Sequence, residues 1–156
     1  MELPLFDQVA EAVRGLLPAE YGDFRHSARR WGIKIWFDSA KPDREHYEAQ
    51  VIGPQHVDDA AVLALEIGFH AEHRQASNNE DVIALLREQE DRWRPRLGDE
   101  AIAGRFLGGA DAWRRLSETW PDPDLGDINL PIELAMRLTD YINALEPLRR
   151  SPDGGG

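Results

Sequence analysis

The chain contains no cysteine in its 156 residues. This absence excludes disulfide bonds, thiolate nucleophiles and zinc sites built on thiolates. It is typical of proteins that work in the reducing interior of a cell, so we expect a cytoplasmic location. The sequence also lacks any run close to the roughly 20 apolar residues that cross a bilayer, and its first residues, MELPLFDQVA, lack the positive region of a signal peptide. We therefore expect no membrane association.

Positive charge is scarce as well. Lysine and arginine together number 18 against 29 aspartates and glutamates, and the formal net charge is −11. Nucleic acids and anionic membranes are polyanions that repel such a surface, so the sequence predicts no general binding to either. The basic residues are unevenly distributed, because the window RHSARRWGIK (residues 25–34) contains four of them and no acidic residue.

The length and composition are typical of a soluble globular protein. Hydrophobic residues make up 42% and charged residues 30% of the chain. A chain of this length buries roughly 68–70% of its unfolded surface without disulfides. No segment is long enough to serve as a linker between two domains. We expect one α+β domain over residues 1–148 and a disordered tail over residues 149–156.

Helical periodicity appears at the two ends of the chain. Phe6, Val9 and Val13 recur at three- and four-residue spacing between two prolines, which predicts a helix over residues 4–17. A similar apolar stripe predicts a final helix over residues 131–145.

Between these helices the apolar residues first alternate with a period of two. The runs WGIKIWFD (31–38), HYEAQVIG (46–53) and LALEIGFHAEH (63–73) each place apolar side chains on one face, and DFRHSAR (23–29) suggests a fourth strand. They predict a three- to four-stranded antiparallel meander with one buried face. Helical periodicity returns over residues 78–95, whereas residues 99–120 fit either strand or helix. The predicted architecture is an N-terminal helix, the meander, and then helices packed on one sheet face.

The polar face of this meander carries the first candidate site. We expect residue 48 to pair with residue 68 on one side and with residue 36 on the other. In this register Trp36 lies over the space left by Gly68. The next row then contains Asp38, His46 and His70, and imidazole with carboxylate suits zinc, manganese or iron. A divalent metal is the one cofactor that the sequence suggests. The alternative is a solvated sheet face whose polar residues pair with each other.

The basic window supplies the second candidate site. Guanidinium groups match phosphate and carboxylate geometry, and exposed tryptophan beside arginine has the composition of an interface hot spot. The partner- or anion-binding residues predicted here are Arg25, Arg29, Arg30, Trp31, Lys34 and Trp36. A protein partner with an acidic segment would suit this surface. The alternative is that these arginines neutralise the protein's own acidic surface or lie with their stems along apolar neighbours.

Two functions follow from these candidates. The first is a small acidic accessory module that binds a protein through the arginine- and tryptophan-rich strand face. The second is a metal-dependent hydrolase or phosphoryl-transfer enzyme that uses the histidine and aspartate row, with Glu48 as a further candidate ligand. No complete catalytic motif occurs in the sequence. A third reading is a homo-oligomer that assembles through the sheet edge and the exposed tryptophans.

Overall fold

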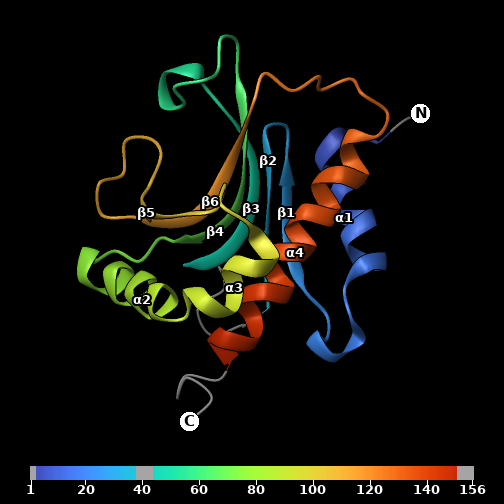
Figure 1. Cartoon of the computed structure of the whole chain (residues 1–156). Coiled ribbons are helices and arrows are strands. Elements are labelled where there is room, and N and C mark those ends of the chain that lie inside the picture. The colour runs from blue at the N-terminus through green and yellow to red at the C-terminus, as the bar shows by residue number, and fades with distance from the viewer. Residues whose placement is uncertain (1–2, 38–43, 151–156) are drawn as a thin grey trace.

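The computed structural model describes residues 3–37 and 44–150. Within these residues the chain forms four α-helices and one six-stranded antiparallel sheet, in the order β1-β2-β3-β4-β6-β5 (Figure 1). The strands are β1 (Arg25–Arg29), β2 (Gly32–Trp36), β3 (Glu45–Ile52), β4 (Ala64–Ala71), β5 (Ile102–Arg105) and β6 (Arg114–Pro121). The helices are α1 (Leu5–Leu16), α2 (Ala76–Glu88), α3 (Glu90–Leu97) and α4 (Leu130–Arg150), and short 3₁₀ turns occupy Ala19–Tyr21 and Pro54–His56.

The α+β class, the N-terminal helix and the antiparallel meander are confirmed, and the fourth strand is present as β1. The predicted strand count was too low, because residues 99–120 supply β5 and β6. β6 pairs with β4 and lies between β4 and β5. Residues 115–118 at the centre of β6 are all buried, so both faces of this strand are covered. The sequence of β6 therefore shows no alternation of apolar and solvent-exposed residues.

The helix predicted over residues 78–95 is two helices, α2 and α3, which meet at Gln89. In a continuous helix the carbonyl of Leu86 would accept a hydrogen bond from residue 90. Here it accepts one from the backbone N–H of Gln89 at 3.0 Å and another from the indole of the buried Trp93 at 2.7 Å. These two bonds replace the helical one and mark the break.

The C-terminal helix runs further than the sequence predicts. Arg149 and Arg150, assigned above to a disordered tail, form the last turn of α4. Arg149 is held there by Glu45 of β3, with Nη2 and Oε1 2.8 Å apart. Residues 151–156 lie outside the described residues.

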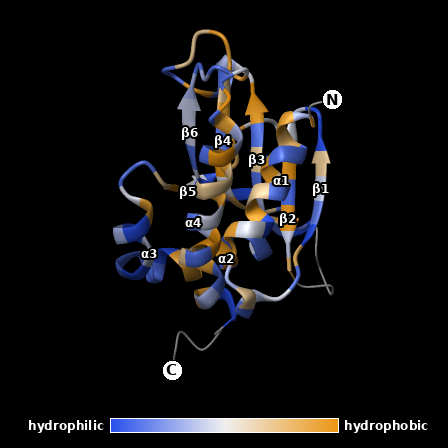
Figure 2. Cartoon of the chain, turned by 90° about the vertical axis from the view of Figure 1, so that its right-hand side faces the viewer, coloured by the Kyte–Doolittle hydropathy of each residue, from blue (hydrophilic) through white to orange (hydrophobic). Residues whose placement is uncertain are grey.

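The hydrophobic core lies between the helices and one face of the sheet. Val9 of α1 and Leu138 of α4 are fully buried, as are Ile35, Tyr47 and Phe69 on the sheet. Figure 2 views the molecule with α1 in front of the sheet and shows hydrophilic and hydrophobic residues alternating along that helix. No helix within the described ranges is long and apolar enough to cross a bilayer. The other sheet face carries the polar residues, and the candidate site lies there.

Candidate metal centre

The pairing of β3 with β4 agrees with the register expected from the sequence. His46 pairs with His70, and Glu48 pairs with Gly68. His46 and His70 of the predicted row therefore do lie side by side, whereas Asp38, its third member, lies outside the described residues.

The pairing of β2 with β3 differs from the expected register by two residues. Lys34, and not Trp36, is the partner of Glu48. A shift of two leaves every side chain on its original face, so alternation alone does not distinguish the two registers. The predicted stacking of Trp36 over Gly68 is wrong, and no space is free there. A Cβ atom on Gly68 would lie 2.4 Å from the carbonyl oxygen of Leu116 in β6.

Four buried side chains converge on the polar face of β3 and β4. The same tripeptide pattern occurs twice, as His46-x-Glu48 within β3 and as His70-x-Glu72 at the end of β4, where Glu72 directly follows the last strand residue. Because side chains alternate along a strand, the histidine and the glutamate of each pattern share a face. The direct pairing of the two histidines then brings one potential ligand atom from each of the four residues within 4.8 Å of the others.

The distances within this cluster suit a shared metal ion. Nε2 of His46 lies 2.9 Å from Oε1 of Glu48 and 3.4 Å from Oε2 of Glu72. Nδ1 of His70 lies 3.0 Å and 3.1 Å from the same two oxygens. Ligands about 2.0–2.1 Å from a zinc ion lie roughly 3.4 Å apart in a tetrahedron and about 2.9 Å apart at right angles. The four distances between histidine nitrogens and carboxylate oxygens are therefore compatible with a shared metal ion.

A fifth residue orients one of the histidines. Oε2 of Glu66 lies 2.9 Å from Nε2 of His70, on the side of the ring away from Glu48. The same oxygen accepts a hydrogen bond from Ser117 Oγ at 2.7 Å, and Gln50 donates to the other oxygen at 2.8 Å. Metal-binding histidines commonly donate their second ring nitrogen to a carboxylate fixed in this way.

The electrostatics of the cluster favour bound positive charge. Burial alone would lower the pKa of His70, but attraction to Glu66 and hydrogen bonds to Glu48, Glu66 and Glu72 outweigh it and raise that pKa well above its ordinary value. Burial by itself would raise the pKa of Glu72, but hydrogen bonds from both histidines lower it to about 2. Burial would also raise the pKa of Glu48, but hydrogen bonds from His46 and His70 lower it further than that of Glu72. Both carboxylates are thus ionised at neutral pH, and either protons on the histidines or a metal ion can neutralise them.

The polar sheet face is covered around His46 and His70, so the alternative of a solvated face does not hold there. Every residue of β4 is buried, and His46 and His70 are both 0% exposed. The loop between β5 and β6 provides part of the cover. The ring of Phe106 contacts the ring of His70 edge-on, with centroids 4.7 Å apart, and Trp113 packs edge-on against Phe106. Water is therefore largely excluded from the histidine side of the cluster.

A pocket of about 360 Å³ opens beside the carboxylate side of the cluster. Of the four cluster residues, Glu48 is the one that lines it. Lys34 lines it too, and its Nζ lies 3.8 Å from Oε1 of Glu72. The remaining lining residues are Ser27, Arg29, Arg30, Trp31, Gly32, Gln50 and Val51.

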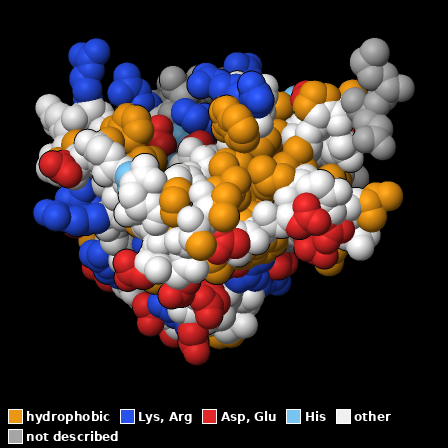
Figure 3. Space-filling view, turned by 90° about the horizontal axis from the view of Figure 1, so that it is seen from above, with side chains coloured by type: hydrophobic (Ala, Val, Ile, Leu, Met, Phe, Trp, Pro, Cys, Tyr) orange, Lys and Arg blue, Asp and Glu red, His pale blue; other side chains and the backbone are white. Residues whose placement is uncertain are grey.

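The six residues of the predicted basic surface lie in two parts of the β1–β2 hairpin, its turn and its strands. Arg30 and Trp31 form its turn, and Trp31 is 53% exposed. The other four residues lie at alternate positions of β1 and β2 on the polar face: Arg25, Arg29, Lys34 and Trp36. Trp36 is only partly exposed. Figure 3 looks onto the end of the molecule that carries the hairpin turn and shows lysine and arginine side chains gathered beside hydrophobic ones.

Sequence reasoning missed Glu72 and Glu66 as members of the site. The signal for Glu72 was present, since the His-x-Glu pattern occurs twice at a spacing that suits two neighbouring strands. For Glu66 there was none, because its role depends on Ser117 in β6, which is 51 residues away in the chain. Comparisons with protein-family models, with curated proteins and with solved structures find no match, so the function is argued from this geometry.

Proposed function

We propose that this protein is a divalent-metal-dependent hydrolase whose metal is bound by His46, Glu48, His70 and Glu72. The observation that carries the proposal is the double position of Glu48, which belongs to the buried cluster and also lines an open pocket. A purely structural ion is normally enclosed by its four protein ligands, whereas a catalytic ion keeps access to water and substrate. Because this site also has four protein ligands, a catalytic role requires a fifth coordination position, which the pocket beside Glu48 would supply.

The ligand chemistry indicates the class of metal. Two imidazole nitrogens with two carboxylate oxygens suit zinc, manganese or iron(II), while magnesium and calcium prefer sites made of oxygen alone. A divalent ion held here would acidify a bound water and polarise the bond to be cleaved. Glu66 would fix the ring of His70 for this task, and Phe106 would keep solvent from the histidine side.

The charge balance of the interior supports the same proposal. Glu48, Glu66 and Glu72 are all buried, at 7%, 0% and 8% exposure. Burying ionised carboxylates without compensation is costly, and the cost is met by pairing or by coordination to a metal. Lys34 and Arg115 supply two positive charges nearby, Arg115 through Ser117. These two cations leave one of the three negative charges, which a divalent ion would offset without a proton on either histidine.

The first experiment is the metal content of protein purified without an affinity tag, with melting curves recorded before and after EDTA. We expect about one equivalent of a transition metal and a lower melting temperature after its removal. His46→Ala and His70→Ala should lose the metal, whereas His56→Ala, which changes an exposed histidine outside the cluster, should keep it. A wild-type protein that stays metal-free after incubation with zinc, manganese and iron(II) would refute the proposal.

The catalytic part of the proposal has its own test. Metal-loaded protein should hydrolyse chromogenic nitrophenyl esters, and the rate should fall to background after EDTA and in Glu48→Gln. A protein that holds its metal but hydrolyses none of a panel of phosphate, carboxylate and sulfate esters would show a structural ion instead.

One observation favours a second function, the binding of an acidic protein segment at the hairpin turn. Trp31 is exposed, and the guanidinium of Arg30 lies over its ring at 4.8 Å from the centroid. β1 is also an edge strand, open to pairing with another chain. Titration with a glutamate-rich peptide, followed by tryptophan fluorescence, tests this function. Equal affinity in wild type and in Arg30→Ala with Trp31→Ala would contradict it.

A further inference from the structure

The pocket beside the metal cluster takes its positive charge from two neighbouring strands. In the β1–β2 ladder Arg29 pairs with Gly32, and Ser27 pairs with Lys34, so Arg29 and Lys34 are diagonal neighbours on the polar face. Gly32 has no side chain and lies between Arg29 and Gln50 in its row. A Cβ atom on Gly32 would lie 3.0 Å from Cβ of Gln50, so the room between the two cations is that of the pocket which they line.

Only one of these cations, Lys34, is paired with a carboxylate among the described residues. Within residues 3–37 and 44–150, no carboxylate lies within ion-pair distance of Arg29 or Arg30, and Lys34 has one contact, at 3.8 Å, with Glu72. In a chain with a net charge of −11, arginines without a nearby carboxylate are unexpected, because acidic residues outnumber basic ones. No ion pair in the described part of the chain supports the alternative that the arginines neutralise neighbouring acidic residues.

The balance of charge in the pocket selects the charge of its ligand. Three cations line the pocket against one carboxylate, that of Glu48, which leaves a formal charge of +2. One oxygen of Glu48 already faces both histidines. A phosphate monoester carries about −1.5 to −2 charges at neutral pH, and a carboxylate carries only one. The pocket is thus matched to a dianion.

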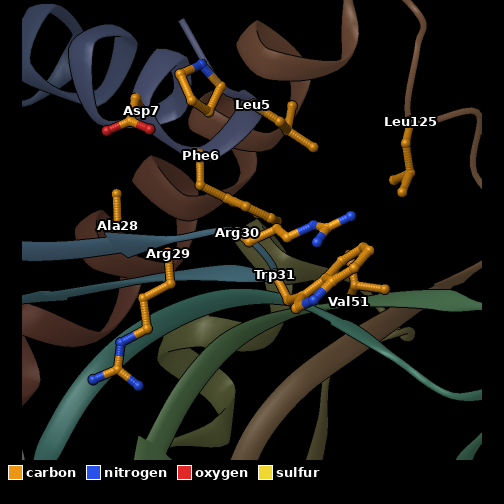
Figure 4. A pocket seen from close by; sticks show the side chains of 10 residues that line it. Leu5, Phe6, Asp7, Ala28, Arg29, Arg30, Trp31, Val51 and Leu125 are labelled. Atoms are coloured by element: carbon orange, nitrogen blue, oxygen red, sulfur yellow. The ribbon is translucent and has the colours of Figure 1, made fainter.

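A second pocket, of about 470 Å³, lies on the other side of the hairpin and shares Arg29, Arg30, Trp31 and Val51 with the first. It is lined largely by apolar side chains, including Leu5, Phe6 and Leu125, and none of its residues belongs to the metal cluster. Figure 4 shows Arg30 and Trp31 lying together in this pocket, whereas Arg29 extends away from them. All three cations line the metal-side pocket, but Arg29 and Lys34 are the two that lie on the polar sheet face with Glu48.

We propose that the substrate is a small phosphate monoester whose phosphoryl oxygens lie between Arg29 and Lys34 beside Glu48. This inference rests on the proposed function. The guanidinium of Arg29 offers paired donors that match phosphate geometry, and the ammonium of Lys34 lies next to the cluster. The volume of about 360 Å³ lies within the range of roughly 300–1,000 Å³ that small-molecule sites occupy.

The reaction balances without a further reactant. Water adds to phosphorus, the bond between phosphorus and the ester oxygen breaks, and the leaving alcohol takes a proton from that water. The products are the free alcohol and inorganic phosphate. Arg29 and Lys34 hold the equatorial oxygens throughout, and their charge stabilises the transition state as the leaving oxygen gains negative charge.

The test is calorimetric titration of metal-loaded protein with phenyl phosphate. Benzoate, which carries one negative charge, and phenol, which carries none, present the same ring and serve as controls. We expect phenyl phosphate to bind at least tenfold more tightly than benzoate, and phenol not to bind. Arg29→Gln and Lys34→Gln should each weaken phenyl phosphate about tenfold or more. Arg25→Gln, on the same strand and face but outside the pocket lining, should change the affinity less than twofold.

Metal content is measured on the same samples, so that the two proposals fail separately. A wild type that binds no metal refutes the proposed function and this inference with it. Metal-loaded protein whose affinity for phenyl phosphate is equal in wild type, Arg29→Gln and Lys34→Gln overturns the phosphate subsite and leaves the metal centre standing. Equal binding of benzoate and phenyl phosphate overturns the choice of a dianion.

Discussion

His46 and His70 lie directly opposite each other on β3 and β4, with ring centroids 5.5 Å apart. Each is followed two residues later by a glutamate on the same face, so this single pairing brings four potential metal ligands together. A slip of one residue in either strand would turn one histidine and its glutamate into the hydrophobic core. The apolar face therefore protects the geometry of the candidate metal centre, because any such slip would also move Tyr47 or Phe69 onto the polar face.

Glu66 is predicted to tune the metal site without touching the metal. Glu66→Gln keeps the size of the side chain but removes the charge that faces Nε2 of His70. We expect metal affinity to fall about 10- to 100-fold, measured by competition with a chelator of known affinity. Glu88→Gln removes the same charge from an exposed position of α2 and serves as the control. An unchanged affinity in Glu66→Gln would show that Glu66 only fills space.

Protons and metal are predicted to compete for the histidines. In the metal-free protein the pKa of His70 is raised, so its ring carries a proton that must leave when a metal binds. Metal affinity should therefore rise with pH. The rise should begin below pH 6.5, the ordinary pKa of histidine being about 6.5, and should continue until the pH exceeds the raised pKa of His70. Calorimetry in buffers of different ionisation enthalpy should show proton release.

The same shift predicts how EDTA sensitivity depends on pH. The raised pKa of His70 stabilises the metal-free protein. This stabilisation is fully present below about pH 6.5 and is lost as the pH rises through the pKa of His70 in the folded state. The drop in melting temperature caused by EDTA should therefore be larger at pH 8.5 than at pH 6. A drop that is constant or smaller at high pH would contradict this coupling.

Phe106 is predicted to slow the exchange of metal. Its ring contacts His70 and is backed by Trp113. Phe106→Ala should open the histidine side to water and chelator, so that loss of metal to excess EDTA becomes several-fold faster while the fold is retained. Leu107→Ala, in the same loop, is the matched control. Equal rates in both variants and in wild type would mean that metal exchanges only through the pocket beside Glu48.

Gly68 is predicted to be required for the approach of β6 to β4. Its φ is +154°, and a Cβ atom there would lie 2.4 Å from the carbonyl oxygen of Leu116. Gly68→Ala should lower the free energy of unfolding by about 2–4 kcal/mol and the melting temperature by roughly 5–15 °C. Gly15→Ala is the opposite case, because Gly15 lies in α1 with no atom near its Cβ position. That variant should be about 0.5–1 kcal/mol more stable.

Local patterns in the sequence specified part of the sheet around the site. Alternation in residues 46–53 and 63–73 identified both strands, their buried faces and the pairing of His46 with His70. It did not identify the register of β2, because Lys34 and Trp36 share a face and either could have been the partner of Glu48. It also did not identify β6, whose buried residues belong to both faces of the sheet.

The sequence by itself determined the strands β2, β3 and β4 and which of their side chains face away from the core, since a period of two residues follows from the backbone geometry of a strand. Only the tertiary structure decided that this polar face is buried. β6 comes from a distant part of the chain to cover Gly68 and bring Ser117 to Glu66, and the loop before it places Phe106 on His70. Such contacts depend on long-range packing, which leaves no local period in the sequence, and they turn a row of polar residues into a candidate metal centre.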